Sequence, residues 1–219
     1  MRIFKLILLF CLAVFVSCDS NTEISAPVKS SDSVVLKDTT ISFLWREFMK
    51  SEDPSDSISN ICIDTNYCRK ISSAEKAAIG YVATFIGNDC QWDGDYKEDR
   101  SNLKCEILSA LNLGYQCSEQ HLGFLRKYFQ GDSIALKELE NCPTTPFTAT
   151  IQESFDEIKI TTKGNLISVF FIADGVNFRE QKAWKWSETD YFEVSRDHIK
   201  LVKKVKSDIE FRDLDFEEN

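Results

Sequence analysis

The sequence contains few histidines and none of the common catalytic motifs. Its two histidines, His121 and His198, lie on different predicted elements. It has no HExxH pair for zinc, no GxSxG turn for a serine nucleophile and no glycine-rich phosphate loop. These absences exclude the familiar zinc, serine-hydrolase and nucleotide-binding signatures. We therefore predict no catalytic residue, no metal site and no cofactor.

Positive charge is also in short supply. The chain has 26 Lys and Arg residues against 35 Asp and Glu residues, a formal net charge of −9. Proteins that bind a phosphate backbone need clustered Lys and Arg, so we expect no nucleic-acid partner. The acidic balance is typical of a soluble mature chain, and an acidic surface shaped for a basic partner is the alternative.

Long apolar runs are absent except at the N-terminus. There, Arg2 and Lys5 precede an eleven-residue apolar run at 6–16. A helix rises about 1.5 Å per residue, so this run reaches only about half of a roughly 30 Å hydrocarbon core. A short basic start before such a run is typical of a secretory signal. We predict that residues 1–17 are cleaved after export.

The end of this run, Phe15-Val16-Ser17-Cys18, resembles the lipobox of bacterial lipoproteins. Ser17 is the small residue that the family has before its cysteine. The resemblance implies cleavage before Cys18, acylation of Cys18 with diacylglycerol and palmitate, and a lipoprotein anchored in the cell envelope, facing the periplasm or the cell surface. Two or more acyl chains make such anchoring stable. The alternative is an ordinary cleaved signal that contains Cys18, after which the protein diffuses freely.

Cysteine pairs with metal or redox spacing are missing too, because no CxxC occurs. Apart from Cys11 in the signal and Cys18, an even number of cysteines remains, which in an exported chain predicts disulfides. These residues are Cys62, Cys68, Cys90, Cys105, Cys117 and Cys142. Sequence alone does not choose among the connectivities, although Cys62 with Cys68 is a plausible local loop.

The part of the chain that carries these cysteines has helical periodicity. Apolar residues at i, i+3, i+4 and i+7 from Ile41 predict a first helix. Ser72 and Glu75 form a capping-box signature for a second helix, and Ser118 can cap a later one. An apolar stripe at 103–111 predicts a further helix between them.

After Cys142 the period changes from 3.6 to 2, which is typical of strands. Strands are expected near 147–153, 155–161, 166–173, 180–187 and 198–205. Gly164-Asn165 and Asp174-Gly175 supply turn residues, so an antiparallel meander is the simplest arrangement. The run at 166–173 is apolar on both faces, which predicts a central strand with helices on at least one side.

These patterns predict an α+β fold, in which a disulfide-stapled N-terminal helical bundle packs on a C-terminal antiparallel β-meander of about five strands. A stretch rich in Ser, Thr and Asp after Cys18 is typical of a flexible tether. The expected parts are the signal at 1–17, lipidated Cys18 with its tether at 18–40, a helical cysteine-bearing part at 41–142, a sheet part at 143–207 and an acidic tail at 208–219.

An aromatic run near the last strands is a candidate binding site. Trp184 and Trp186 share one face of a predicted strand, and Tyr191 follows nearby. Trp and Tyr combine a large contact area with a polar group and are enriched at binding interfaces. Packing of these rings into the core is the competing interpretation, since the helices must cover part of the sheet.

An acidic loop between two predicted helices matches the first half of an EF-hand. Asp89, Asp93 and Gly94 occupy the first, fifth and sixth positions of a calcium loop. The closing position is Arg100, where calcium requires a bidentate carboxylate. We therefore predict a solvated acidic loop held by Cys90.

The expected function is that of a lipid-anchored, non-enzymatic cell-envelope protein. Its partners are the membrane, through acylated Cys18, and an unidentified protein or envelope component, with an inhibitor or immunity-like role as one form. The alternative is a small envelope hydrolase that cleaves cell-wall glycan through Asp and Glu carboxylates. Such chemistry needs only two carboxylates suitably placed in one cleft.

Overall fold

A computed structural model of the protein describes residues 36–50, 57–90, 102–143 and 150–214. The chain divides into two units, Met1–Ser31 and Asp32–Asn219, and all described residues belong to the second. The predicted signal, Cys18, most of the predicted tether and positions 91–101 of the acidic loop lie outside the described residues.

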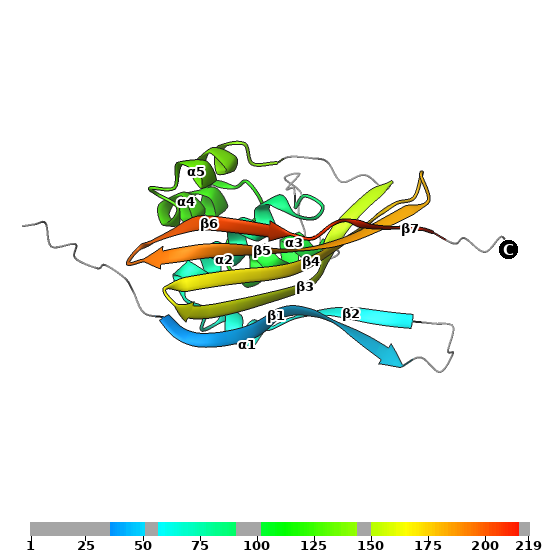
Figure 1. The fold of residues 1–219 in the computed structure, drawn as a ribbon, viewed down its shortest axis with the longest axis horizontal. Helices are drawn as coiled ribbons and strands as arrows, with labels where there is room; N and C mark the ends of the chain where they lie inside the picture. The colour runs from blue at the N-terminus through cyan, green and yellow to red at the C-terminus, as the bar shows by residue number, and fades with distance from the viewer. Residues whose placement is uncertain (1–35, 51–56, 91–101, 144–149, 215–219) are drawn as a thin grey trace, which may run out of the picture. The chain divides into compact units, whose positions relative to one another are not determined.

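The described strands form one antiparallel sheet in the order β2-β1-β3-β4-β5-β6, with β7 paired to the start of β5 (Figure 1). The strands are β1 (Leu36–Lys50), β2 (Ser57–Ile63), β3 (Ile151–Gly164), β4 (Leu166–Asn177), β5 (Lys182–Ser195), β6 (His198–Lys206) and β7 (Glu210–Asp213). Strands β3 to β6 form the predicted meander, while β1 and β2 extend the sheet beyond β3.

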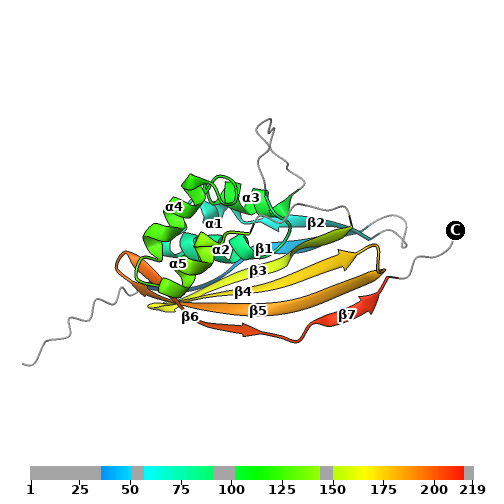
Figure 2. The same cartoon turned by 90° about the horizontal axis from the view of Figure 1, so that it is seen from above.

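The described helices all lie between β2 and β3 in the sequence. They are α1 (Thr65–Cys68), α2 (Ser73–Phe85), α3 (Leu103–Ala110), α4 (Glu119–Tyr128) and α5 (Ser133–Glu140). Figure 2 shows them gathered on one side of the sheet. The α+β class is therefore confirmed, with the described helices inserted between two groups of strands.

Local capping signals in the sequence are confirmed. The Ser72 hydroxyl accepts the Glu75 N–H at 3.2 Å, and the Glu75 carboxylate accepts the Ser72 N–H at 3.0 Å. This reciprocal pair is the capping box that starts α2. Ser118 caps the start of α4, because its hydroxyl accepts the His121 N–H at 3.1 Å.

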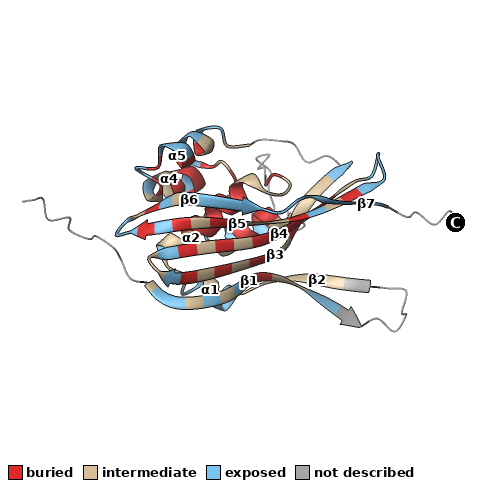
Figure 3. Cartoon of the chain, in the orientation of Figure 1, coloured by how far each residue is buried: buried red, intermediate tan, exposed pale blue. Residues whose placement is uncertain are grey.

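The core lies between α2 and the helix-facing side of the sheet. Residues 77–84 of α2 are all buried, and small side chains let the helix approach its neighbours. A Cβ at Gly80 would lie 2.7 Å from Leu113 Cδ1, so a larger residue would push α2 away from that neighbour. Along β4, alternate residues are buried, as Figure 3 shows. This alternation fixes which face of the sheet the helices cover.

The predicted first helix is wrong, because the residues concerned form β1. Ile41 lies opposite Ile160 of β3, so this segment pairs with a distant part of the chain. A bulge before Leu44 inserts one residue, and both Phe43 and Leu44 are fully buried. The bulge lengthens the spacing between the inward residues Ile41 and Leu44 from two to three, which mimics a helical period. The described structure accordingly has two strands, and no helical bundle, before α1.

Four strand, turn and tail assignments also differ from prediction. Positions 147–149 of the strand expected at 147–153 lie outside the described residues, and the rest of it forms one strand, β3, with the strand expected at 155–161, through a bulge at Asp156. Asp174-Gly175, predicted as a turn, lies inside β4. Strand β1 begins at Leu36, within the expected tether, and β7 lies within the expected acidic tail. Pairing with other strands extends these segments beyond their local signals.

Candidate functional site

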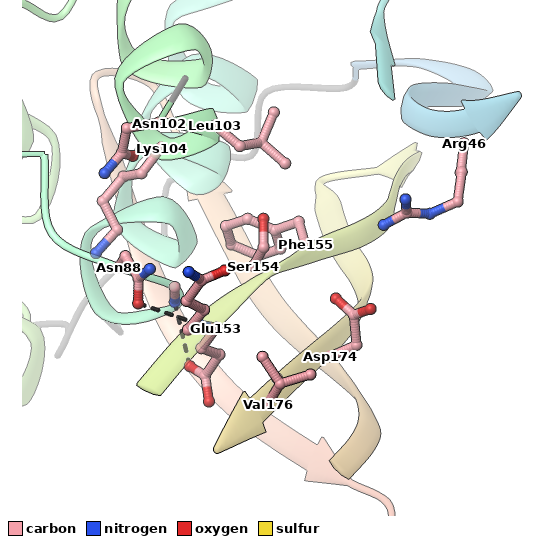
Figure 4. Close-up of a pocket in the computed structure, with 13 residues that line it drawn as sticks. Arg46, Asn88, Asn102, Leu103, Lys104, Glu153, Ser154, Phe155, Asp174 and Val176 are labelled. Atoms are coloured by element: carbon pink, nitrogen blue, oxygen red, sulfur yellow. Dashed lines mark hydrogen bonds between the residues drawn. The ribbon is translucent and has the colours of Figure 1, made fainter. Parts of the chain in front are cut away.

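A groove of about 520 Å³ opens where β1 separates from β3 (Figure 4). The two strands stay paired only as far as Leu44 and Ile158, so the first part of β3 has no pairing with β1. The groove follows this part of β3 and is also lined by β1, β4, the segment after α2 and the start of α3. Its lining includes Arg46, Asn88, Lys104, Glu153, Asp174 and Val176.

The free edge of β3 is partly closed by Asn88. The Asn88 N–H donates to the Glu153 carbonyl at 2.9 Å, and the Glu153 N–H donates to Asn88 Oδ1 at 3.1 Å. These bonds occupy the backbone groups that a partner strand would use at this residue. At Glu153, the groove therefore presents side chains to a ligand.

Arg46 reaches across from β1 to the bulge of β3. Its Nε donates to Asp156 Oδ1 at 2.5 Å, and its Nη1 donates to Ser59 Oγ at 2.9 Å. Lys185 of β5 donates to the other Asp156 oxygen at 2.8 Å. Burial alone would raise the pKa of Asp156, but the hydrogen bonds from Lys185 and Arg46 outweigh it and lower that pKa. Asp156 is thus a carboxylate with two cationic partners.

Asp174, the second carboxyl group near Arg46, is held differently. It is half-buried on β4 and lies opposite Lys185 in the strand register. Burial raises its pKa, and the charge of Asp156 adds to this effect; Arg46, Lys185 and a hydrogen bond with its own backbone offset only part of it. Asp174 is therefore a carboxyl group whose proton affinity is increased by its position in the groove.

Glu153 is tied into the wall of the groove. Its carboxylate accepts the Gly87 N–H at 3.2 Å through one oxygen and the Trp184 Nε1–H at 3.3 Å through the other. The Trp184 ring lies directly over Gly175, where an added Cβ would come within 2.2 Å of it. Glycine at 175 therefore lets the indole reach Glu153 and hold this wall in place.

Lys104 of the groove lining belongs to a buried ion pair. Lys104 Nζ lies 3.4 Å from Asp89 Oδ1 and 3.4 Å from the Thr84 carbonyl oxygen. The Lys104 and Asp89 side chains are only 2% and 4% exposed. Gln116 Nε2 donates to the same Asp89 oxygen and the same carbonyl, each at 3.0 Å. Burial lowers the pKa of Lys104 to about 8, although the charge of Asp89 opposes this shift.

Two disulfides border this network, so the prediction of disulfides is confirmed for four of the six cysteines. Cys90 pairs with Cys105, and Cys117 pairs with Cys142. Each cysteine adjoins in sequence a residue of the network: Asp89, Lys104, Gln116 or Pro143, whose carbonyl accepts a Gln116 hydrogen bond at 3.2 Å. The disulfides therefore hold the chain segments that bring the ion pair together.

The disulfides expected at Cys62 and Cys68 are wrong, and the plausible local loop between them does not form, because both are free thiols. Ile61 and Ile63 of β2 pack against the core, as does Cys68 at the end of α1. Side chains alternate along a strand, so Cys62, between the two isoleucines, faces the opposite side from the core. The two thiols are consequently directed to different surroundings.

The aromatic residues predicted to bind a ligand do not form one site. Trp186 is 6% exposed and packs edge-on against Phe171 at 5.3 Å between ring centroids, which is a core position. Trp184 supports the groove wall through Glu153. Tyr191 lies on the opposite face of β5, because it is an odd number of residues away along a strand paired without a bulge to β4.

The groove brings together residues that no sequence motif links. Arg46, Asp156 and Asp174 come from three strands, and Arg46 lies in the segment expected to be helical. The only local signal is that Asp174 ends an otherwise apolar run in β4. Contacts between strands, which depend on the sheet register, assemble the site.

The two histidines lie outside the groove lining. His198 is half-buried at the start of β6, near Gln130. His121 is fully buried; its Nδ1 accepts the Cys117 N–H at 3.1 Å, and its Nε2 lies 3.2 Å from Thr84 Oγ1. These bonds assign the neutral ring with its proton on Nε2. Burial, and to a smaller extent the charge of Lys104, lowers the pKa of His121 to about 4.

His121 is expected to make the protein sensitive to acid. As pH falls from 6.5 towards 4, the unfolded chain binds a proton at this residue that the folded chain does not, so the free energy of unfolding falls. Denaturant unfolding at pH 7.5 and 4.5 should show that the wild type loses about 2–3 kcal/mol more than His121→Gln between these values. An equal loss in both proteins would contradict this role.

Asp190, which is 3% exposed, acts in the opposite direction. Burial, with a hydrogen bond to Glu188, raises its pKa to about 8, and Oδ1 has no hydrogen-bond partner among the described residues. Its contribution to stability is complete below about pH 4 and is lost as pH rises through 8. The effect of Asp190 is the same in the wild type and in His121→Gln, because both proteins contain it. The difference between their pH dependences therefore reports His121 alone.

Comparisons with known proteins return no match, whether with family models, curated proteins or solved structures. Within the described ranges, no helix is both long and apolar enough to cross a membrane. The same residues contain no group of three or more His, Cys, Asp or Glu side chains arranged to hold a metal ion. The groove and the polar network beside it are therefore the features of the described residues that bear on function.

Proposed function

We propose that the protein is a lipid-anchored, non-enzymatic envelope protein that binds another protein or an envelope component through the groove between β1 and β3. An inhibitor or immunity-like role is one form of this function. The observation that carries the proposal is a groove of about 520 Å³ whose walls come from both the sheet and the helical layer. Grooves of this size with a few convergent polar groups are the usual place for a binding site.

The support around the groove favours a preformed site. The Cys90–Cys105 disulfide ties the start of α3 to the segment after α2, and both segments contribute to the lining. Trp184 and Gly87 hold Glu153 from the other side. A rigid groove loses little conformational entropy when it binds a partner, which increases affinity. The predicted anchor at Cys18 would present this groove near a membrane surface.

Hydrolysis of a cell-wall glycan is the second candidate, because Glu153 and Asp174 both line the groove and the pKa of Asp174 is raised. A retaining or inverting mechanism needs one carboxylic acid and one available carboxylate. Both oxygens of Glu153 already accept hydrogen bonds within the protein. Glu153 would have to leave these partners to act as a base or nucleophile, so binding is the better supported function.

Filling the groove is expected to abolish partner capture. The soluble fragment 19–219, which lacks Cys18, is immobilised and exposed to envelope extract, and it should retain a partner that mass spectrometry can identify. Ser154 lines the groove, so Ser154→Trp should reduce capture by a factor of about ten or more through steric exclusion. Circular dichroism and the melting temperature should remain close to those of the wild type.

Ser168→Trp is the matched control. Ser168 is a half-buried β4 residue opposite Tyr191, outside the groove lining, and the substitution adds the same bulk to the sheet. Capture should be unchanged in this variant. Equal capture by the wild type and both variants would show that the groove is not the binding site, and release of sugar from a glycan by the purified domain would favour the hydrolase instead.

A further inference from the structure

Asp174 differs from the other charged groups of the groove lining, because the side chains of those groups are already bound to other protein groups. Arg46 is bound by Asp156 and Ser59. Lys104 is paired with Asp89. Glu153 accepts hydrogen bonds on both oxygens. The carboxylate of Asp174 has a hydrogen bond with its own backbone. None of the described side chains donates a hydrogen bond to it, so among the charged groups of the groove lining it is the one that side chains leave available to a ligand.

We infer that the groove receives a basic side chain, Lys or Arg, of a protein partner and that Asp174 is its counter-ion. This inference rests on the proposed binding function and names the chemistry of the partner at that same site. The interaction is a charge-assisted hydrogen bond between the carboxylate of Asp174 and the incoming ammonium or guanidinium group.

The groove also offers a contact for the stem of such a side chain. Val176 is two residues from Asp174 on β4, so their side chains lie on the same face of the strand. Figure 4 shows Asp174 and Val176 next to each other, with the side chain of Arg46 reaching from β1 toward β3. Lys and Arg bury their methylene groups along apolar surface while the charged end binds a polar group. Val176 can therefore contact the methylene groups of a basic side chain while Asp174 binds its charged end.

Charge arguments favour a cation over an anion. An anionic ligand would meet Asp174 directly, while the cations around it, Arg46 and Lys185, already share the carboxylate of Asp156. The same sharing reduces the repulsion that these two residues exert on an incoming cation. The formal net charge of −9 also attracts a basic partner during diffusional encounter.

The inferred pair predicts how binding depends on pH. Burial and Asp156 raise the pKa of Asp174, with Arg46 and Lys185 acting in the opposite direction. A cation binds the ionised carboxylate more strongly than the protonated acid. Binding should therefore weaken as pH falls through the raised pKa of Asp174, and a bound cation should lower that pKa.

A titration with a minimal ligand tests the inference directly. The probe is N-acetyl-arginine amide, and N-acetyl-citrulline amide is its uncharged analogue of nearly the same shape. Backbone amide shifts of Gly175 and Val176 in the ¹⁵N-labelled mature chain report binding. We expect saturable shifts with the arginine probe, with a dissociation constant on the order of 1 mM. The citrulline probe should bind at least about fivefold more weakly.

Two variants separate the local charge from the net charge. Asp174→Asn should weaken binding of the arginine probe by about fivefold or more, while the amide spectrum confirms that the domain is folded. Asp197→Asn changes the net charge equally at an exposed position outside the groove and should bind as the wild type does. Equal binding of the two probes, or unchanged affinity in Asp174→Asn, would overturn the inference.

The outcome also distinguishes this inference from the proposed function. If Ser154→Trp abolishes partner capture but the arginine probe does not depend on Asp174, the groove binds a partner of different chemistry and the inference fails. If the probe binds through Asp174 but capture is independent of Ser154→Trp, the cation site stands and the proposed function of the groove fails.

Discussion

Replacing Lys104 with methionine is expected to lower the free energy of unfolding by about 3–5 kcal/mol. The substitution keeps most of the side-chain volume but removes the charge that faces Asp89. Asp89 would then be a buried carboxylate whose remaining side-chain donor among the described residues is Gln116. Its other oxygen, Oδ2, is already without a hydrogen-bond partner among the described residues. An uncompensated buried charge is among the most destabilising changes that one substitution can introduce.

Denaturant unfolding of a double-mutant cycle measures this effect. The double variant Asp89→Asn with Lys104→Met should be more stable than Lys104→Met alone, because it contains no unpaired charge. The control is Lys182→Met, since Lys182 and Asp213 form an exposed pair at 4.0 Å that should contribute less than about 1 kcal/mol. A loss below about 1 kcal/mol in Lys104→Met would show that the ion pair is not buried in solution.

Removing the Cys117–Cys142 disulfide by a double alanine substitution is expected to lower the free energy of unfolding by roughly 3.5 kcal/mol. The two cysteines are separated by 25 positions. The bond between them closes this loop in the unfolded chain and so reduces the number of conformations that the unfolded chain can adopt. The Cys90–Cys105 bond closes a shorter loop, with a separation of 15, and its loss should cost about 3 kcal/mol. Both variants should also loosen the network around Gln116, which contacts Cys90 and Pro143.

The free cysteines supply the control for the disulfide experiment. Cys62→Ser with Cys68→Ala removes the same number of sulfur atoms without removing a bond, and the free energy of unfolding should change by less than about 1 kcal/mol. Thiol labelling of the unfolded, unreduced mature chain should find reactive Cys62 and Cys68. Protection of both residues from labelling would contradict the pairing described here.

The extent to which the fold could be predicted differs between its two layers. Helices α2 and α4 were predicted at their first turns, because Ser72, Glu75 and Ser118 interact with backbone groups only three residues away. Strand β1 was predicted as a helix, because its hydrophobic spacing is changed by a bulge that exists only when β1 pairs with β3. A sequence pattern therefore predicts interactions between residues a few positions apart well, and pairing between distant segments poorly.

The candidate site was less predictable than the fold. Trp184 was singled out, but its role in the structure is to hold Glu153 across a glycine rather than to form an aromatic surface with Tyr191. Arg46 and Asp174 had no motif to mark them, and Asp174-Gly175 was predicted as a turn. They meet because β1 departs from β3 beside the bulge at Asp156. Their contact depends on the pairing register of the strands, which cannot be read from the local sequence around either residue.

The sequence by itself determined the acidic charge, the helix caps and the change from helical to strand periodicity, because each depends on composition or on residues a few positions apart. It also predicts export and acylation at Cys18 from the first eighteen residues. Only the tertiary structure decided which cysteines pair, that residues 36–50 form a strand, and which charges surround the groove. Each of these outcomes requires segments far apart in the chain to meet, and the sheet register together with the buried polar network decides which segments do so.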